Sequence, residues 1–243
     1  MKMDGTELSA RFALPPNSRA YCGKPSFRKA FAAFLADRRA ANRMALEREL
    51  SKFTAHYAYL RLIASASGLS PFDKKVAEAL WIGNGLLEKV RIRDLRKILL
   101  QQFCGKGMLP KSRAKRLAES LPGGFAPHHS FHVLYLHTIS GVIEPSVENA
   151  DSCRVSWGKV IRAGSGFVEV ATQRLAKENG RLLLLPVKKR WKTSCAGVTL
   201  LDKPKAGDVV ASHWGIAVME LAPAQVRRLE KFTEINLKAA NSE

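Results

Sequence analysis

The sequence is poor in cysteine, and its cysteines form none of the usual close-spaced patterns. Cys22, Cys104, Cys153 and Cys195 are widely spaced in a chain of 243 residues, with no Cys-x-x-Cys. This spacing argues against a zinc ribbon and against a dense disulfide framework. A reducing cytoplasm is the expected compartment.

Long apolar runs and the short motifs of common enzymes are also missing. No stretch of about eighteen apolar residues occurs, so we expect no membrane span. The first residues, Met1 to Gly5, lack the apolar core of a signal peptide. Because no phosphate-binding loop, dinucleotide fingerprint or Ser/His/Asp order is present, we do not expect an enzyme.

Negative charge is scarce. The chain has 40 Lys and Arg against 21 Asp and Glu, a net charge of +19. The excess is spread over both halves, with 24 basic and 12 acidic residues in 1–150 and 16 and 9 in 151–243. Such a surface attracts polyanions. Because no zinc-finger spacing or clear recognition helix accompanies the charge, we expect only non-specific nucleic-acid binding.

The pattern of the chain changes near residue 150. Residues 1–25 look irregular, with Pro15-Pro16 among several breakers. From Ser26 onward, apolar residues recur at helical spacing, first in one long pattern to Leu50. Residues 131–137 fit either a strand or a buried helix. Glu144-Pro145 marks a break, and we place the domain boundary between about 145 and 152.

Beyond the boundary the pattern favours short strands. Asn179-Gly180 is typical of a hairpin turn, residues 209–218 read as one strand, and a helix follows Pro223. We therefore predict an α+β protein. A mostly helical domain, residues 1–148, precedes a small β-barrel with a C-terminal helix, residues 151–243.

Two motifs in the second region carry a family resemblance. Cys153-x-x-x-x-Gly158-Lys159-Val160 opens the first predicted strand, and Gly207-Asp208-Val209-Val210-x-x-His213-x-Gly215-x-Ala217 lies in a later one. Together they resemble the Cys-x-x-x-Pro-Gly-Lys-Val and Gly-Asp-x-Val-x-x-His-x-Gly-x-Ala motifs of the small hydrogenase assembly chaperones, the HypC/HupF family. The resemblance covers about residues 153–237.

The resemblance implies a chaperone-like β-barrel that helps to assemble the iron–cyanide–carbon monoxide unit of [NiFe]-hydrogenase and deliver it to the large subunit. It also implies that Cys153 and His213 contact iron or a partner protein. Two departures are present: Trp157 replaces the family's proline, and Cys153 is internal, whereas the family's cysteine follows the initiator Met. Residues near Tyr21 and Trp81 resemble uncharacterised proteins encoded beside [NiFe]-hydrogenase genes.

The chemistry of these residue types agrees with a soft-metal role. A thiolate and a neutral imidazole both ligate iron, and Arg154 and Lys159 would favour the thiolate form of Cys153 if they lay close. A buried structural cysteine is the alternative. The turns at Gly158, Gly207-Asp208 and Gly215 would shape the backbone around the pair.

A few other residues are candidates for a second contact. Cys22 lies in a predicted loop, and His128 and His132 are four residues apart, so a helix would place both on one face. A polar loop or satisfied core histidines are the alternative. Asp73, near Ser70 at a predicted helix start, reads as a capping carboxylate.

We therefore expect a cytoplasmic accessory protein for [NiFe]-hydrogenase maturation that binds the large subunit or the partners delivering the iron unit. Two alternatives come from other classes. One is a basic nucleic-acid-binding protein with a small translation-type barrel, and the other is a permanent structural subunit of a hydrogenase complex.

Overall fold

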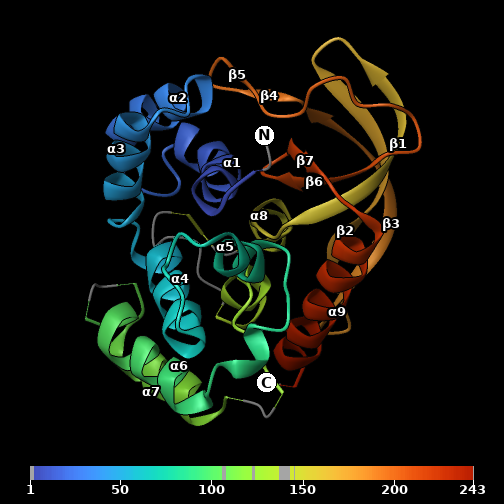
Figure 1. The fold of residues 1–243 in the computed structure, drawn as a ribbon. Helices are drawn as coiled ribbons and strands as arrows, with labels where there is room; N and C mark the ends of the chain where they lie inside the picture. Colours follow the sequence, from blue (N-terminus) through green and yellow to red (C-terminus); the bar gives the residue numbers. More distant parts are fainter. Residues whose placement is uncertain (1–2, 106–107, 122–123, 137–142, 145, 243) are drawn as a thin grey trace.

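A computed structural model describes residues 3–105, 108–121, 124–136, 143–144 and 146–242. The fold is α+β, as predicted (Figure 1). The α-helices are α1 (Gly5–Ser18), α2 (Arg28–Ala36), α3 (Ala40–Leu50), α4 (Thr54–Ser67), α5 (Lys74–Trp81), α6 (Ile92–Lys97), α7 (Lys111–Glu119), α8 (Val147–Cys153) and α9 (Pro223–Ala240). The strands are β1 (Ser156–Gly164), β2 (Phe167–Glu178), β3 (Arg181–Lys192), β4 (Ser194–Cys195), β5 (Val198–Thr199), β6 (Val209–His213) and β7 (Ile216–Glu220).

Helix α1 lies near the middle of the molecule, in contact with the helices α2 and α5 and with the strands β6 and β7 (Figure 1). The expectation of an irregular N-terminus was wrong. The Asp4 side chain caps α1 by accepting from the Glu7 amide, and Pro15 and Pro16 lie inside its last turn. Nearly every residue of α1 is buried, so tertiary packing outweighs the helix-breaking tendency of the prolines.

The remaining helices largely follow the apolar periodicity, with corrections at their ends. The single long pattern from Ser26 to Leu50 is divided into a 3₁₀ turn, Pro25–Phe27, and the helices α2 and α3. The predicted capping role of Asp73 is confirmed, because its carboxylate accepts from the Lys75 amide at the start of α5. Further 3₁₀ and π-helical segments are Leu87–Lys89, Ile98–Phe103 and Phe131–Tyr135.

The C-terminal region contains a five-stranded sheet. Its strand order is β1-β2-β3-β7-β6. The last strand in this order, β6, also pairs with the first, β1, so the two edges of the sheet are joined. The predicted turn at Asn179-Gly180 is confirmed, because both residues have positive φ and they connect β2 to β3. The predicted strand 209–218 is two strands, β6 and β7, separated by Trp214 and Gly215. Helix α9 packs against β3.

One hydrophobic cluster joins the helices and the sheet. It includes Phe12 and Leu80 from the helical region and Ile216, Val218 and Leu229 from the other side of the predicted boundary. Helix α8 crosses that boundary, and Pro145 lies outside the described residues. The division into 1–148 and 151–243 stays a prediction, and the shared core weighs against independent folding of the two parts. None of the described helices is long and apolar enough to cross a membrane.

Candidate metal site

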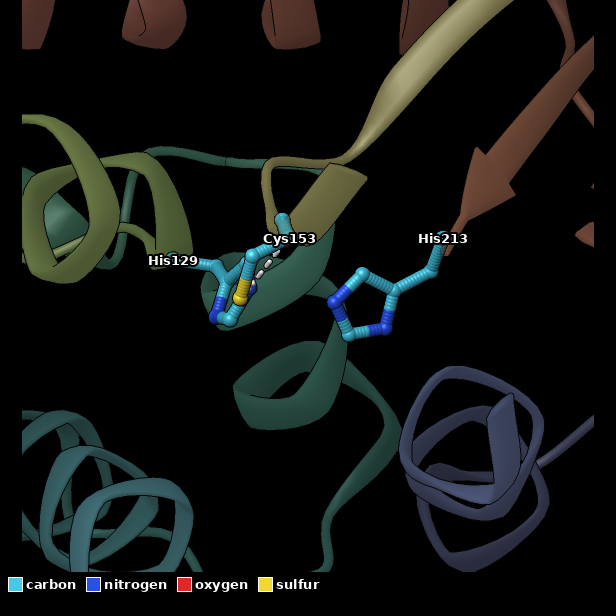
Figure 2. A group of neighbouring side chains, drawn as sticks. All are labelled: His129, Cys153 and His213. Carbon is cyan, nitrogen blue, oxygen red and sulfur yellow. Dashed lines mark hydrogen bonds between the residues drawn. The ribbon is translucent and has the colours of Figure 1, made fainter. Parts of the chain in front are cut away.

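Three side chains from separate elements meet beside α1 and α5. His129 precedes the π-helical segment Phe131–Tyr135, Cys153 is the last residue of α8, and His213 is the last residue of β6. One ligand atom from each lies within 4.8 Å of the other two, and Figure 2 shows the three side chains side by side. Cys153 was expected to open a strand, but β1 begins three residues later.

The His213 ring is held in one orientation by a hydrogen bond. Its Nδ1 lies 2.6 Å from the carbonyl oxygen of Phe12 in α1. A carbonyl can only accept, so Nδ1 carries the proton and Nε2 has the lone pair. Nε2 is buried and has no hydrogen-bond partner among the described residues. An imidazole that donates from one nitrogen to a backbone carbonyl and presents the other is the usual form of a metal-ligating histidine.

His129 and Cys153 are in direct contact. The His129 Nε2 donates to the carbonyl oxygen of Cys153 at 2.9 Å, and the Cys153 Sγ lies 3.9 Å from the same nitrogen. Trp81, the last residue of α5, packs on both histidines, with its ring centroid 4.5 Å from His129 and 5.5 Å from His213. The stacked ring of Phe12, at 4.9 Å, fixes the indole from its other side.

Burial keeps the groups of the site neutral. It raises the pKa of the Cys153 thiol well above its usual range, and the nearby Cys22 thiol adds to this effect. Burial lowers the pKa of His213 to about 3 and that of His129 to about 4. The expected help from Arg154 is not found, because its buried guanidinium pairs with Asp151 at 2.9 Å.

A cavity of about 340 Å³ opens beside the three side chains. Exposed residues, among them Lys24 and Lys52, form its outer part, and the buried Cys153 and His213 lie at its inner end. The space between is lined mainly by aromatic and histidine side chains. The site is therefore enclosed by protein and still reachable from solvent.

Two of the predicted second contacts line this cavity and one does not. Cys22 and His132 are lining residues. Burial raises the pKa of the Cys22 thiol to about 12. His128 instead faces another part of the core, where its Nδ1 lies 2.8 Å from the Ser130 hydroxyl.

The predicted motif turns act on the backbone. Gly158 is in β1, where a Cβ would lie 2.9 Å from the Ala171 carbonyl oxygen, so only glycine fits. Asp208 accepts from the Lys205 amide at 2.7 Å and closes the turn that contains Gly207 and precedes β6. Gly215 has φ +72° in the turn directly after His213 and Trp214. Lys159 is exposed on β1, away from the cavity.

Two residues of the candidate site, His129 and Trp81, were not predicted as contacts from the sequence. Trp81 was noted only in the resemblance of the N-terminal region. Four histidines, His56, His129, His132 and His213, line the cavity, out of six in the whole chain. This concentration was not detectable from spacing, since His56 and His213 come from distant segments.

The set of donors fits a borderline or soft transition metal. Imidazole nitrogen and thiolate sulfur suit iron, nickel, copper and zinc, whereas magnesium and calcium prefer oxygen. The orphaned lone pair of His213 is the observation that supports this fit. The positions of the other two donors, within 4.8 Å, are compatible with a shared ion after a small inward movement.

Comparisons with known proteins add one finding. No curated protein and no solved structure matches the chain. A family model described as a family of unknown function, DUF6390, matches residues 1–243, the full length of the sequence. The protein therefore belongs to the DUF6390 family.

Proposed function

We propose that this protein is an accessory protein in the assembly of the [NiFe]-hydrogenase metal centre, and that Cys153 and His213 hold the iron unit during transfer. One observation carries the proposal: the cysteine of one motif and the histidine of the other, from α8 and β6, meet within 4.8 Å at the same cavity.

The fold also supports the proposal. The joined order of the five strands and the C-terminal helix α9 agree with the small barrel that the resemblance implies. Cys153 is internal and offers no α-amino group, so a ligand from elsewhere must complete the set. His129, from the helical region, lies next to the thiol and would take that role in the tautomer that carries its proton on Nδ1, which breaks the hydrogen bond from Nε2 to the Cys153 carbonyl.

Metal binding would release a proton from the Cys153 thiol. A thiol with a raised pKa is protonated at neutral pH and must lose its proton to become a ligand. Trp214 counters part of the burial effect by approaching the Cys153 sulfur. The bound metal would supply the positive charge that stabilises the thiolate. The proton would leave to solvent through the cavity, because the buried imidazoles, with pKa values of about 3 to 4, do not hold a proton at neutral pH.

The test is hydrogenase activity in a strain that lacks this protein and is complemented with variants. Cys153→Ala should abolish active hydrogenase, and His213→Ala should lower it less. Cys195→Ala is the matched control, because Cys195 is equally buried but bonds to Ser18 outside the cavity. Cellular protein levels must be equal in all strains.

Full activity from Cys153→Ala would contradict iron transfer through this thiol. Nucleic acid that stays bound to the purified protein at roughly several times the physiological salt concentration would favour the nucleic-acid alternative, because binding by charge alone weakens steeply with salt.

A further inference from the structure

The lining of the cavity is unusual in its charge. Its described lining residues include Lys24, Lys52 and four histidines, but no Asp or Glu. Lys24 forms no ion pair among the described residues, and Lys52 pairs with Glu49 at 2.9 Å. A cavity without carboxylates and with cationic groups at its entrance favours negative or electron-rich ligands over free cations.

Several buried polar atoms that belong to cavity-lining residues have no partner, and water does not reach these atoms in the structure. They are both ring nitrogens of His56, the Tyr59 hydroxyl and the Trp81 indole nitrogen. All three residues line the cavity and are at least nine-tenths buried, with 7%, 2% and 3% of their surface exposed. Leaving a buried donor without an acceptor costs about 1–3 kcal/mol, so such groups in one place indicate a ligand that satisfies them.

The three groups have complementary chemistry. Trp81 can only donate, and neutral His56 and Tyr59 each have one proton to donate. Trp81 also contacts His129 and His213 through its ring, so the indole lies beside the candidate ligands. A small acceptor molecule in the cavity would therefore lie close to these residues and to the metal position, and movements of the lining side chains would bring the donors into contact with it.

We propose that the cavity binds a small, hydrogen-bond-accepting anion as an additional ligand of a metal held by His129, Cys153 and His213, and that Trp81, Tyr59 and His56 bind this anion. The inference rests on the proposed function only in taking Cys153 and His213 as metal contacts. Three protein ligands leave an open coordination position, and the cavity has room for far more than one water molecule.

Cobalt(II) and azide are suitable probes. Cobalt(II) has visible absorption that reports its coordination, and thiolate ligation adds a charge-transfer band. We expect the purified full-length protein to bind one cobalt(II) ion, with the charge-transfer band lost in Cys153→Ala. Azide should then change the visible bands of the cobalt-loaded protein in a saturable way.

The donor residues are tested by variants that keep an aromatic ring at each position. Tyr59→Phe and Trp81→Phe each remove an N–H or O–H group, and each should weaken azide binding about tenfold, the usual effect of losing a hydrogen bond to a charged group. Trp191→Phe is the matched control, since Trp191 is an equally buried tryptophan in β3 outside the cavity. It should bind azide like the parent protein.

The outcomes separate this inference from the proposed function. Absence of cobalt binding, absence of an azide effect on the bound cobalt, or unchanged azide affinity in both donor variants would each overturn the inference. None of these results depends on hydrogenase activity in cells. Conversely, loss of hydrogenase activity in Cys153→Ala together with a silent azide titration would retain the proposed function and remove the anion.

Discussion

The hydrogen bond between His213 and the Phe12 carbonyl is the contact on which the geometry of the site most depends. It links β6 to α1 and leaves Nε2 of the imidazole directed at Cys153 and His129. The same side chain therefore has a structural partner on one side and a candidate metal on the other. The two roles can be separated by substitution.

We predict different stabilities for two variants of this histidine. His213→Asn can still donate to the Phe12 carbonyl and should stay within about 1 kcal/mol of the parent in free energy of unfolding. His213→Ala leaves that carbonyl unpaired beside a new cavity and should cost about 2–4 kcal/mol. Urea denaturation measures both, and equal stability of the two variants would contradict the structural role of the bond. Both should lose cobalt affinity.

At this scale the sequence revealed part of the site. Cys153 and His213 were singled out because each lies in a motif that resembles one of the hydrogenase chaperone motifs, and the structure brings the two side chains together. His129 and Trp81 were not, because their role arises from contacts between α5, α8 and β6 that no local pattern encodes. The effect of burial on the Cys153 thiol was also missed, since Arg154 was expected to act on the thiol and pairs with Asp151 instead.

Among the elements, the pair β1 and β2 shows how a single glycine limits packing. At Gly158 an added Cβ would lie 2.9 Å from the Ala171 carbonyl oxygen and 3.0 Å from the Thr172 Cβ. If β1 and β2 move apart to make room for this Cβ, they lose backbone hydrogen bonds to each other.

Gly158→Ala should therefore lower the free energy of unfolding by about 1–3 kcal/mol. Gly85→Ala is the control, because Gly85 is exposed and its Cβ would meet no atom within 4 Å. We expect the control to change stability by no more than about 0.5 kcal/mol. Thermal or urea unfolding monitored by circular dichroism measures both variants. A neutral Gly158→Ala would show that β1 shifts without cost.

Most elements followed from periodicity and turn chemistry, and the failures have physical causes. Helix α1 was missed because its prolines read as breakers, while burial on all sides stabilises it. The segment 131–137 was left undecided, and the structure describes Phe131–Tyr135 as π-helical, a form with no sequence signature of its own. Residue 137 lies outside the described residues.

For the whole molecule, buried histidines make stability depend on pH. Burial lowers the pKa of His56, His128, His132 and His213 to about 3. In the unfolded chain histidine has a pKa of about 6.5. The unfolded state therefore binds more protons between these values, and stability is complete above pH 6.5 and falls as the pH drops toward 3.

We predict that the metal-free protein loses up to about 1.4 kcal/mol per buried histidine for each pH unit below 6.5. Unfolding should thus occur well above the range in which carboxylates titrate. His56→Phe keeps a ring against Phe53 and Trp81 but removes one protonating group. Its acid midpoint, measured by tryptophan fluorescence, should move to lower pH. An unchanged midpoint would mean that burial does not keep His56 neutral in the folded protein.

The domain division shows the limit of sequence patterns at this scale. The change from helical to strand patterning near residue 150 was correctly placed, but patterning does not report which faces pack together. Here α1 packs on β6 and β7, and one hydrophobic cluster includes both regions. The candidate metal site lies at this junction, with His129 on one side and His213 on the other.

The central position of α1 also has a consequence for biosynthesis. Arg11 donates to the Leu200 and Val218 carbonyls, and Phe12 accepts from His213, so α1 leaves the ribosome long before these three partners are synthesised. At about 5–20 residues per second the segment waits on the order of 10–40 s for them. Ribosome-bound chains stalled before residue 200 should therefore expose residues 5–18 to protease, and full-length chains released from the ribosome should protect them.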